Sequence, residues 1–262
     1  MPTLKPNSVV CAVTLLLGCG TPPPTPGSQE PSGSQVLVEP AAGQPRLLLF
    51  SRTAAFRHDS IAAGIQGLTS LAQQQGLGLT ASEDAAELSD DKLAPFGAVI
   101  FLSTTGDALG PEQQAAFERY IRAGRGFVGI HAAADCEYDW PWYGALVGAY
   151  FAGHSDVVAA NVLVEPVQHP AVQGLPAPWS RTDEWYGFRT NPRAQVQVLL
   201  TVDETTFDPG PGAMGADHPI AWSHEYDGGR AFYTSLGHTA QSYSDSLFLG
   251  HLLGGINYVL GR

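Results

Sequence analysis

The chain has 262 residues, which is enough for one large α/β domain with a sizeable core, or for two small domains. Its formal net charge is −12 and its pI is about 4.9, and no cluster of Lys or Arg offsets this acidity. The composition therefore argues against nucleic-acid binding and against docking on anionic lipid by charge.

The amino-terminal residues 1–18 have the features of a bacterial lipoprotein signal peptide. Lys5 supplies positive charge, residues 9–17 form an apolar run too short to span a bilayer, and Leu16-Leu17-Gly18-Cys19 resembles a lipobox. We expect cleavage before Cys19 and a lipid anchor on that residue. Ordinary secretory cleavage, or a chance apolar stretch, is the alternative. The predicted location is the cell envelope, with Gly20 compatible with sorting to an outer membrane.

Residues 19–44 are rich in Pro, Gly, Ser and Thr and are predicted to form a disordered linker. Residues 45–262 are predicted to form the functional domain. Cleavage at Cys19 would leave Cys136 as the single unmodified cysteine, so no disulfide framework is expected. Cys136 could act as a nucleophile, but a lone cysteine among small residues is more often a packed core thiol.

The first half of the domain alternates buried strands with amphipathic helices. Short apolar runs predict strands over residues 45–51, 77–82, 97–103 and 127–130. Apolar periodicity predicts intervening helices, which start near Ser60, Ser89 and Pro111 and end near Gly76, Phe96 and Gly124. This alternation with short connections predicts an α/β fold with a mostly parallel, doubly wound sheet.

The second half of the domain has a different pattern of predicted elements. A helix is predicted from Asp139 toward Tyr150, and strands are predicted over residues 157–166 and 195–201. Residues 181–188 combine charged and aromatic side chains in a non-helical stretch. Residues 219–237 are predicted to form a hairpin with a Gly-rich turn, and a final apolar helix covers residues 247–259.

The segment from Gly126 to Asp139 is the centre of the functional prediction. Its buried strand turns sharply at His131, at the carboxyl end of the sheet, where open α/β sheets bind their ligands. Nucleophile elbows use the same geometry to expose a serine. Asp135 follows one helical turn later, so we expect His131 to face a ligand. A histidine that only bonds neighbouring backbone is the alternative.

Other polar side chains also follow predicted strands and should converge on this edge. We expect acid–base catalysis by His131 and His238, with Asp135 and Glu184 orienting them or sharing the proton. No HExxH or paired CxxC motif is present. His131, His154 and His238 could nevertheless hold a divalent metal such as Zn²⁺ or Mg²⁺ from separated positions.

Aromatic faces beside carboxylates and arginines suit sugar rings, although many Trp and Tyr side chains belong to cores. About half of these aromatics are expected to line the site. The residues predicted to contact substrate are Arg57, His58, Thr104, Tyr138, Trp140, Asp183, Trp185, Tyr186 and Tyr243. His169, His218 and His251 are interpreted as structural.

Six segments in this order resemble the ThuA-like (trehalose utilisation) family. They are Phe56–Ile61, Gly129–Asp135, Tyr138–Tyr143, Gly148–His154, Arg181–Tyr186 and Tyr233–Thr239. The resemblance covers Arg46 to the end of the chain. It implies a class I glutamine amidotransferase-like fold, which is a flavodoxin-like three-layer sandwich.

That fold places a cysteine at the elbow, where this sequence has His131, and a later histidine, which His238 resembles. Glutamine hydrolysis by a thiolate is therefore not expected. The resemblance implies a small carbohydrate substrate, including an oxidised (keto) sugar.

We expect an envelope enzyme that performs hydrolysis or elimination on a glycoside or keto-glycoside. The alternative is a non-catalytic module that binds glycan or an envelope partner. The sequence does not indicate the oligomeric state.

Overall fold

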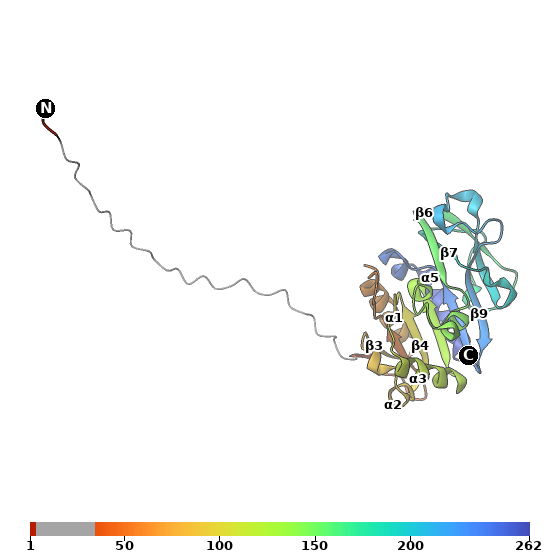
Figure 1. Cartoon of the computed structure of the whole chain (residues 1–262). Helices are drawn as coiled ribbons and strands as arrows, with labels where there is room; N and C mark the ends of the chain where they lie inside the picture. The colour runs from red at the N-terminus through yellow and green to blue at the C-terminus, as the bar shows by residue number, and fades with distance from the viewer. Residues whose placement is uncertain (4–34) are drawn as a thin grey trace. The chain divides into compact units, whose positions relative to one another are not determined.

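The computed structural model describes residues 1–3 and 35–262, and the folded domain lies within residues 35–262 (Figure 1). Cys19, the lipobox and most of the predicted linker lie outside the described residues. Gln35–Val38 form strand β1, which pairs antiparallel with β3 (Gly78–Ser82). The linker prediction over residues 19–44 therefore extends too far, because Leu37 and Val38 pack against the core and Gln35–Val38 pair in the sheet.

A ten-stranded mixed sheet forms the middle layer, in the order β1-β3-β2-β4-β5-β10-β9-β8-β6-β7. The core from β3 to β10 is parallel, and the pairs beyond it on either side are antiparallel. The predicted α/β fold class is confirmed, with parallel pairing confined to the core. The remaining strands are β2 (Arg46–Phe50), β4 (Phe96–Leu102), β5 (Gly126–Ile130), β6 (Phe151–Val164), β7 (Trp179–Phe188), β8 (Gln197–Val202), β9 (Pro219–Tyr226) and β10 (Gly229–Thr234).

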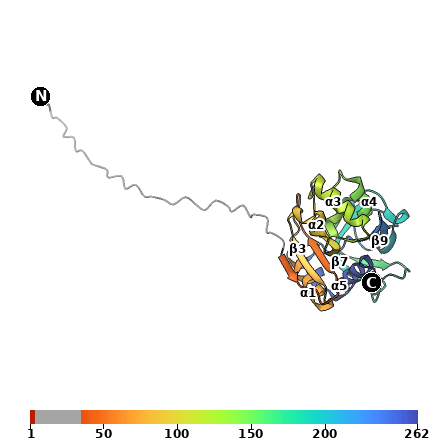
Figure 2. The same ribbon diagram turned by 90° about the horizontal axis from the view of Figure 1, so that it is seen from below.

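Helices cover both faces of this sheet (Figure 2). Helices α1 (Ile61–Gln75) and α5 (Ser246–Val259) pack on one face, as shown by the core cluster that they share with Leu47 and Leu49 of β2. The intervening β2 residues, Leu48 and Phe50, point to the other face, because successive side chains of a strand alternate. That face is covered by α2 (Asp90–Leu93), α3 (Pro111–Arg122) and α4 (Pro141–Val147).

Two buried histidines bond to Ala171 in the connection between β6 and β7, and one of them, His251, links this connection to α5. The Nδ1 atom of His169 accepts the backbone N–H of Ala171 at 3.1 Å, and the Nδ1–H of His251 donates to the Ala171 carbonyl oxygen at 2.8 Å. Burial lowers the pKa of both histidines to about 4. Both side chains therefore remain neutral in the folded protein at neutral pH.

We expect the free energy of unfolding to fall as the pH drops from about 6.5 to about 4. In this window the unfolded chain takes up protons on His251 that the folded chain excludes, so stability rises with pH. The loss attributable to His251 is of the order of 3 kcal/mol, at about 1.4 kcal/mol per pKa unit. Chemical denaturation across this range should show a flatter pH dependence for His251→Gln. An unchanged slope in that variant would show that His251 takes up its proton equally in the folded and the unfolded chain.

Candidate functional site

The predicted elbow is present at the end of β5. His131 has a φ of +53°, which is uncommon for a residue other than glycine, and a 3₁₀ turn over His131–Ala134 follows. Strand β10 and the residue after it hold this conformation from both sides. The Nδ1–H of His131 donates to the carbonyl oxygen of Ser235 at 2.7 Å, and the hydroxyl of Tyr233 donates to the carbonyl oxygen of His131 at 2.8 Å. The surrounding structure therefore fixes both the backbone and the ring of His131.

Four side chains meet beside the elbow, and we call them the histidine cluster: His58, His131, Glu184 and His238. The Nε2 atom of His131 lies 3.2 Å from Nδ1 of His238 and 3.6 Å from Oε2 of Glu184. The same Oε2 lies 3.1 Å from Nδ1 of His238. The ring centroid of His58 is 4.7 Å from that of His131 and 5.3 Å from that of His238. One atom from each of the four side chains falls within 4.8 Å of the others.

The three histidines of the cluster come from the carboxyl ends of parallel strands. His58 follows β2, His131 follows β5, and His238 follows β10, in agreement with the convergence expected from the sequence. Glu184 comes from β7, which is four positions away from β10 in the sheet. The antiparallel half of the sheet must therefore curl back toward the carboxyl edge of the parallel half.

Asp183 holds β7 in this position. Its carboxylate accepts hydrogen bonds from the backbone N–H groups of Gly237 and His238, each at 3.0 Å. It also accepts a hydrogen bond from the Arg181 guanidinium at 3.0 Å. Burial raises the pKa of Asp183, while Arg181 and the backbone donors oppose the shift. Asp183 is fully buried, so it positions His238 and does not contact substrate, in contrast to the sequence prediction.

Gly237 is required at this junction. Its φ is +111°, and a Cβ atom would lie 2.7 Å from the hydroxyl oxygen of Tyr243. Glycine therefore allows the loop to bring both N–H groups onto Asp183.

The cluster histidines differ in their protonation. Burial lowers the pKa of His131 well below its usual value and lowers that of His58 to about 4. The hydrogen bond to Glu184 raises the pKa of His238. At neutral pH the buried rings of His58 and His131 are therefore neutral.

The solvent side of the cluster carries a second group of polar and aromatic side chains. Oε1 of Glu184 lies 3.2 Å from Nδ1 of His154, whose side chain is 49% exposed. The Tyr138 hydroxyl donates to Asp135 at 2.6 Å, and the Arg189 guanidinium lies 4.0 Å above the Tyr138 ring. Glu184 therefore connects the buried histidines to a side chain that solvent reaches.

Three residues of this region were missed by the sequence reasoning. Arg189 directly follows the strand that carries Glu184, and its position after a strand was the available signal. Phe56 is 65% exposed and packs against His58, with ring centroids 4.8 Å apart. Phe151 packs against Tyr186 and His154, with ring centroids 4.4 and 6.0 Å away.

The ring of Tyr186 packs against the histidine cluster. Its ring centroid lies 4.3 Å from that of His131, and the side chain is buried. Glu184 and Tyr186 are two residues apart on β7 and so share a face, whereas Trp185 points to the other face. Trp185 is fully buried and its indole N–H donates to Val158, so it does not wall the site.

Four other predicted substrate contacts also lie away from the reacting groups. Trp140 belongs to the core under α4 and donates to Glu118, and Tyr243 is buried against Phe248. Arg57 is exposed and pairs with Glu83 at 2.7 Å. Thr104 is buried, and its neighbour Thr105 instead fixes the preceding loop by donating to the carbonyl oxygen of Phe56.

Cys136 is a core thiol. It is fully buried, its Sγ donates to the Gly106 carbonyl oxygen, and burial raises its pKa. A buried thiol with a raised pKa is a poor nucleophile.

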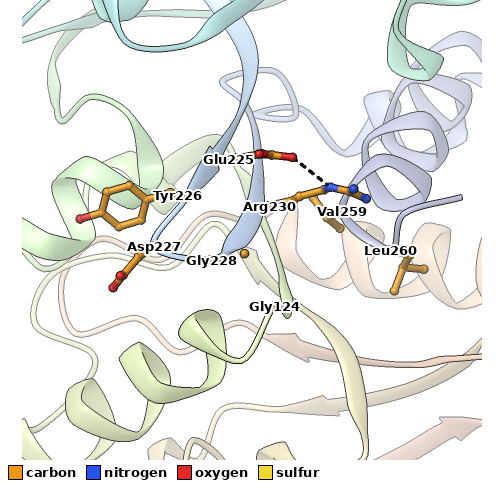
Figure 3. A pocket seen from close by; sticks show the side chains of 9 residues that line it. Gly124, Glu225, Tyr226, Asp227, Gly228, Arg230, Val259 and Leu260 are labelled. Atoms are coloured by element: carbon orange, nitrogen blue, oxygen red, sulfur yellow. Dashed lines mark ion pairs between the residues drawn. The ribbon is translucent and has the colours of Figure 1, made fainter.

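A hollow of about 410 Å³ lies at the opposite end of the parallel strands (Figure 3). Much of its lining belongs to the β9–β10 turn and to Gly124, and its ion pair joins Glu225 and Arg230 at 3.8 Å. This is the amino end of β10, where parallel sheets do not place their ligands. The histidine cluster, with its convergent titratable groups, is therefore the better candidate for chemistry.

The family model described as ThuA, trehalose utilisation, matches residues 46–259. The chain belongs to the ThuA family. The match includes the whole histidine cluster, so the cluster is part of a ThuA domain. A comparison with curated proteins gives no significant match.

Solved structures similar to this ThuA domain support the fold. A ThuA-like protein from Bacteroides uniformis is 23% identical with a TM-score of 0.72, covering 84% of this chain and 94% of that one. A ThuA-like protein from Parabacteroides merdae is 19% identical with a TM-score of 0.69, covering 83% and 90%. PurLQS from Thermotoga maritima is 12% identical with a TM-score of 0.51, covering 82% and 99%. The class I glutamine amidotransferase-like fold expected from the sequence is confirmed.

Proposed function

We propose that this ThuA protein is an enzyme that acts on a carbohydrate, by hydrolysis or elimination on a glycoside or keto-glycoside. The observation that carries the proposal is the approach of His131, His238 and Glu184 to within 3.1–3.6 Å of one another from three different strands. Structural residues have no reason to gather three titratable groups at a ligand-binding edge. The family description, trehalose utilisation, supports a sugar as the substrate class.

The geometry favours a division of work different from the one expected from the sequence. His131 is fully buried and one of its ring nitrogens is bonded to Ser235, so it does not exchange protons directly with solvent. We assign His131, His238 and Glu184 to the reacting centre. We assign proton exchange with the substrate to His154 and Asp135, which lie on the solvent side of it.

Aromatic and charged side chains beside the cluster match the chemistry of a sugar. Tyr138 and Phe151 are partly exposed, and Phe56 is largely exposed. Their rings suit the C–H faces of a sugar, while Arg189 and Asp135 offer a donor and an acceptor for hydroxyl groups. These five residues are the proposed substrate contacts.

The test is a screen of the full-length protein against paired glycosides and their keto derivatives, with products followed by NMR. Turnover of at least one pair supports the proposal, and faster turnover of the keto form assigns elimination beside the carbonyl. Calorimetry on the same compounds identifies the alternative. Binding without any product would make the protein a glycan-binding module and would overturn catalysis.

We further propose an envelope location, with a lipid on Cys19. The support is the sequence Leu16–Cys19 and the Pro-, Gly- and Ser-rich character of the residues that follow. Among the described residues, no helix is both long and apolar enough to cross a bilayer. Mass spectrometry of the native amino terminus is the test, and an intact, unmodified terminus would overturn this proposal.

A further inference from the structure

We infer that His58, His131, His238 and Glu184 bind one divalent cation with zinc-like ligand preference. Zinc in proteins takes nitrogen and oxygen ligands at about 2.0–2.1 Å, so the ligands of a tetrahedral site lie about 3.3 Å apart. The separations in the histidine cluster are 3.1, 3.2 and 3.6 Å among His131, His238 and Glu184. Three donor atoms therefore already lie at the spacing of the corners of a coordination tetrahedron.

The hydrogen bonds around His131 leave the correct nitrogen free. Its Nδ1 carries the proton, because it donates to the carbonyl oxygen of Ser235. Its Nε2 therefore presents a lone pair to the centre of the cluster. Histidines that bind metals almost always donate their other N–H in this way, which orients the ring.

His58 provides the fourth donor and an independent sign of an unfilled role. Its side chain is only 6% exposed, and its Nδ1 is buried without a hydrogen-bond partner among the described residues. A buried polar atom without a partner costs free energy, which a bound cation would recover here. One of the His58 ring nitrogens lies within 4.8 Å of the ligand atoms of the other three side chains, so a cation at the centre would give this ring a partner.

The donor set selects the kind of cation. Three imidazoles and one carboxylate suit Zn²⁺ and its transition-metal neighbours, whereas Mg²⁺ prefers octahedral oxygen ligands. The metal ligands expected from the sequence were His131, His154 and His238, and the structure replaces one of these three. His154 approaches Oε1 of Glu184 from the solvent side, while His58 takes its place in the cluster.

A shared proton is the competing account of this geometry. One proton on Nδ1 of His238, shared between Nε2 of His131 and Oε2 of Glu184 as acceptors, would account for both short contacts without metal. That account leaves His58 unexplained, because it gives the buried Nδ1 no partner. The cation accounts for all four side chains.

The experiment is metal uptake by the full-length chain after chelation and reloading with Zn²⁺. We expect about one Zn²⁺ per chain by elemental analysis, and Co²⁺ should give the intense visible absorption of a tetrahedral site. His58→Ala and Glu184→Gln should weaken Zn²⁺ binding by more than the ~10–100-fold that loss of a supporting group costs. His224→Gln, on β9 outside the cluster, is the matched control and should bind as the wild type does.

Thermal melting guards against misfolded variants. Zn²⁺ should raise the melting temperature of the wild type and of His224→Gln, and should leave both cluster variants unchanged, because only the folded cluster binds. Glu184→Gln is isosteric, so it remains informative if His58→Ala fails to fold. Wild-type uptake no greater than that of the cluster variants would overturn the inference.

The inference rests on the proposed function only for the use of the site, because metal uptake is measured without substrate. Uptake without turnover of any sugar would overturn the proposed function alone. Turnover that survives complete metal removal would overturn a catalytic use of the cation and leave the carbohydrate chemistry standing.

Discussion

Glu184→Gln is expected to lower kcat by about 10²–10⁴-fold, the usual contribution of acid–base catalysis, because Glu184 links the reacting centre to His154, the side chain proposed to exchange the proton with the substrate. The substitution keeps the shape of the side chain and removes the negative charge that faces His131, His238 and His154. Initial rates on the glycoside identified by screening, with circular dichroism as a folding check, measure the effect. The melting temperature should change far less than the rate.

Glu225→Gln is the matched control for this variant. It makes the same chemical change on the β9–β10 hairpin, at the opposite end of the parallel strands, where Glu225 is 80% exposed. Its kcat should equal that of the wild type. Equal rates for both variants would remove Glu184 from the reacting centre and leave the cluster as a structural feature.

Asp183→Ala is expected to lower the free energy of unfolding by about 3–5 kcal/mol, because it removes the nearest carboxylate from the buried charge of Arg181. Arg181 has a side chain that is only 6% exposed, and it contacts Asp183 at 3.0 Å. The backbone N–H groups of Gly237 and His238 would also lose their acceptor. Denaturation in urea, analysed with a fixed slope, gives the free energy.

A double variant separates the two causes. In Arg181→Met/Asp183→Ala the unpaired charge is absent, so part of the stability should return relative to Asp183→Ala. Asp91→Ala, an exposed change on α2, should stay within about 0.5 kcal/mol of the wild type. A cost below 1 kcal/mol for Asp183→Ala would show that other contacts hold the His238 loop.

The parallel core could be predicted because each of its strands is a short apolar run with a polar or glycine boundary. In contrast, β6 begins at Phe151, six residues before the predicted start. Residues 151–156 lack the alternation that marks a strand, and they are held by pairing with β7 across register shifts. Pairing of this kind depends on a distant partner, so the local sequence carries little sign of it.

The candidate site could also be predicted only in part from the sequence. The rule that ligands bind at the carboxyl edge of a parallel sheet was sufficient to bring His58, His131 and His238 together. This rule could not tell which face of β7 meets the site. Alternation along a strand places neighbouring side chains on opposite faces, but it does not show which of the two faces is turned toward the site. For this reason Asp183 and Trp185 were expected to contact substrate alongside the predicted catalytic Glu184.

The curl that brings β7 onto the end of β10 also affects the order in which the chain folds during its synthesis. The four cluster residues are spread from position 58 to position 238, and His238 is translated after all ten strands. An emerging chain can form the β2–β5 core early, but it has no complete cluster until β10 has paired between β5 and β9. The most reactive groups of the molecule are thus assembled last, so an incompletely folded chain has no complete reacting centre.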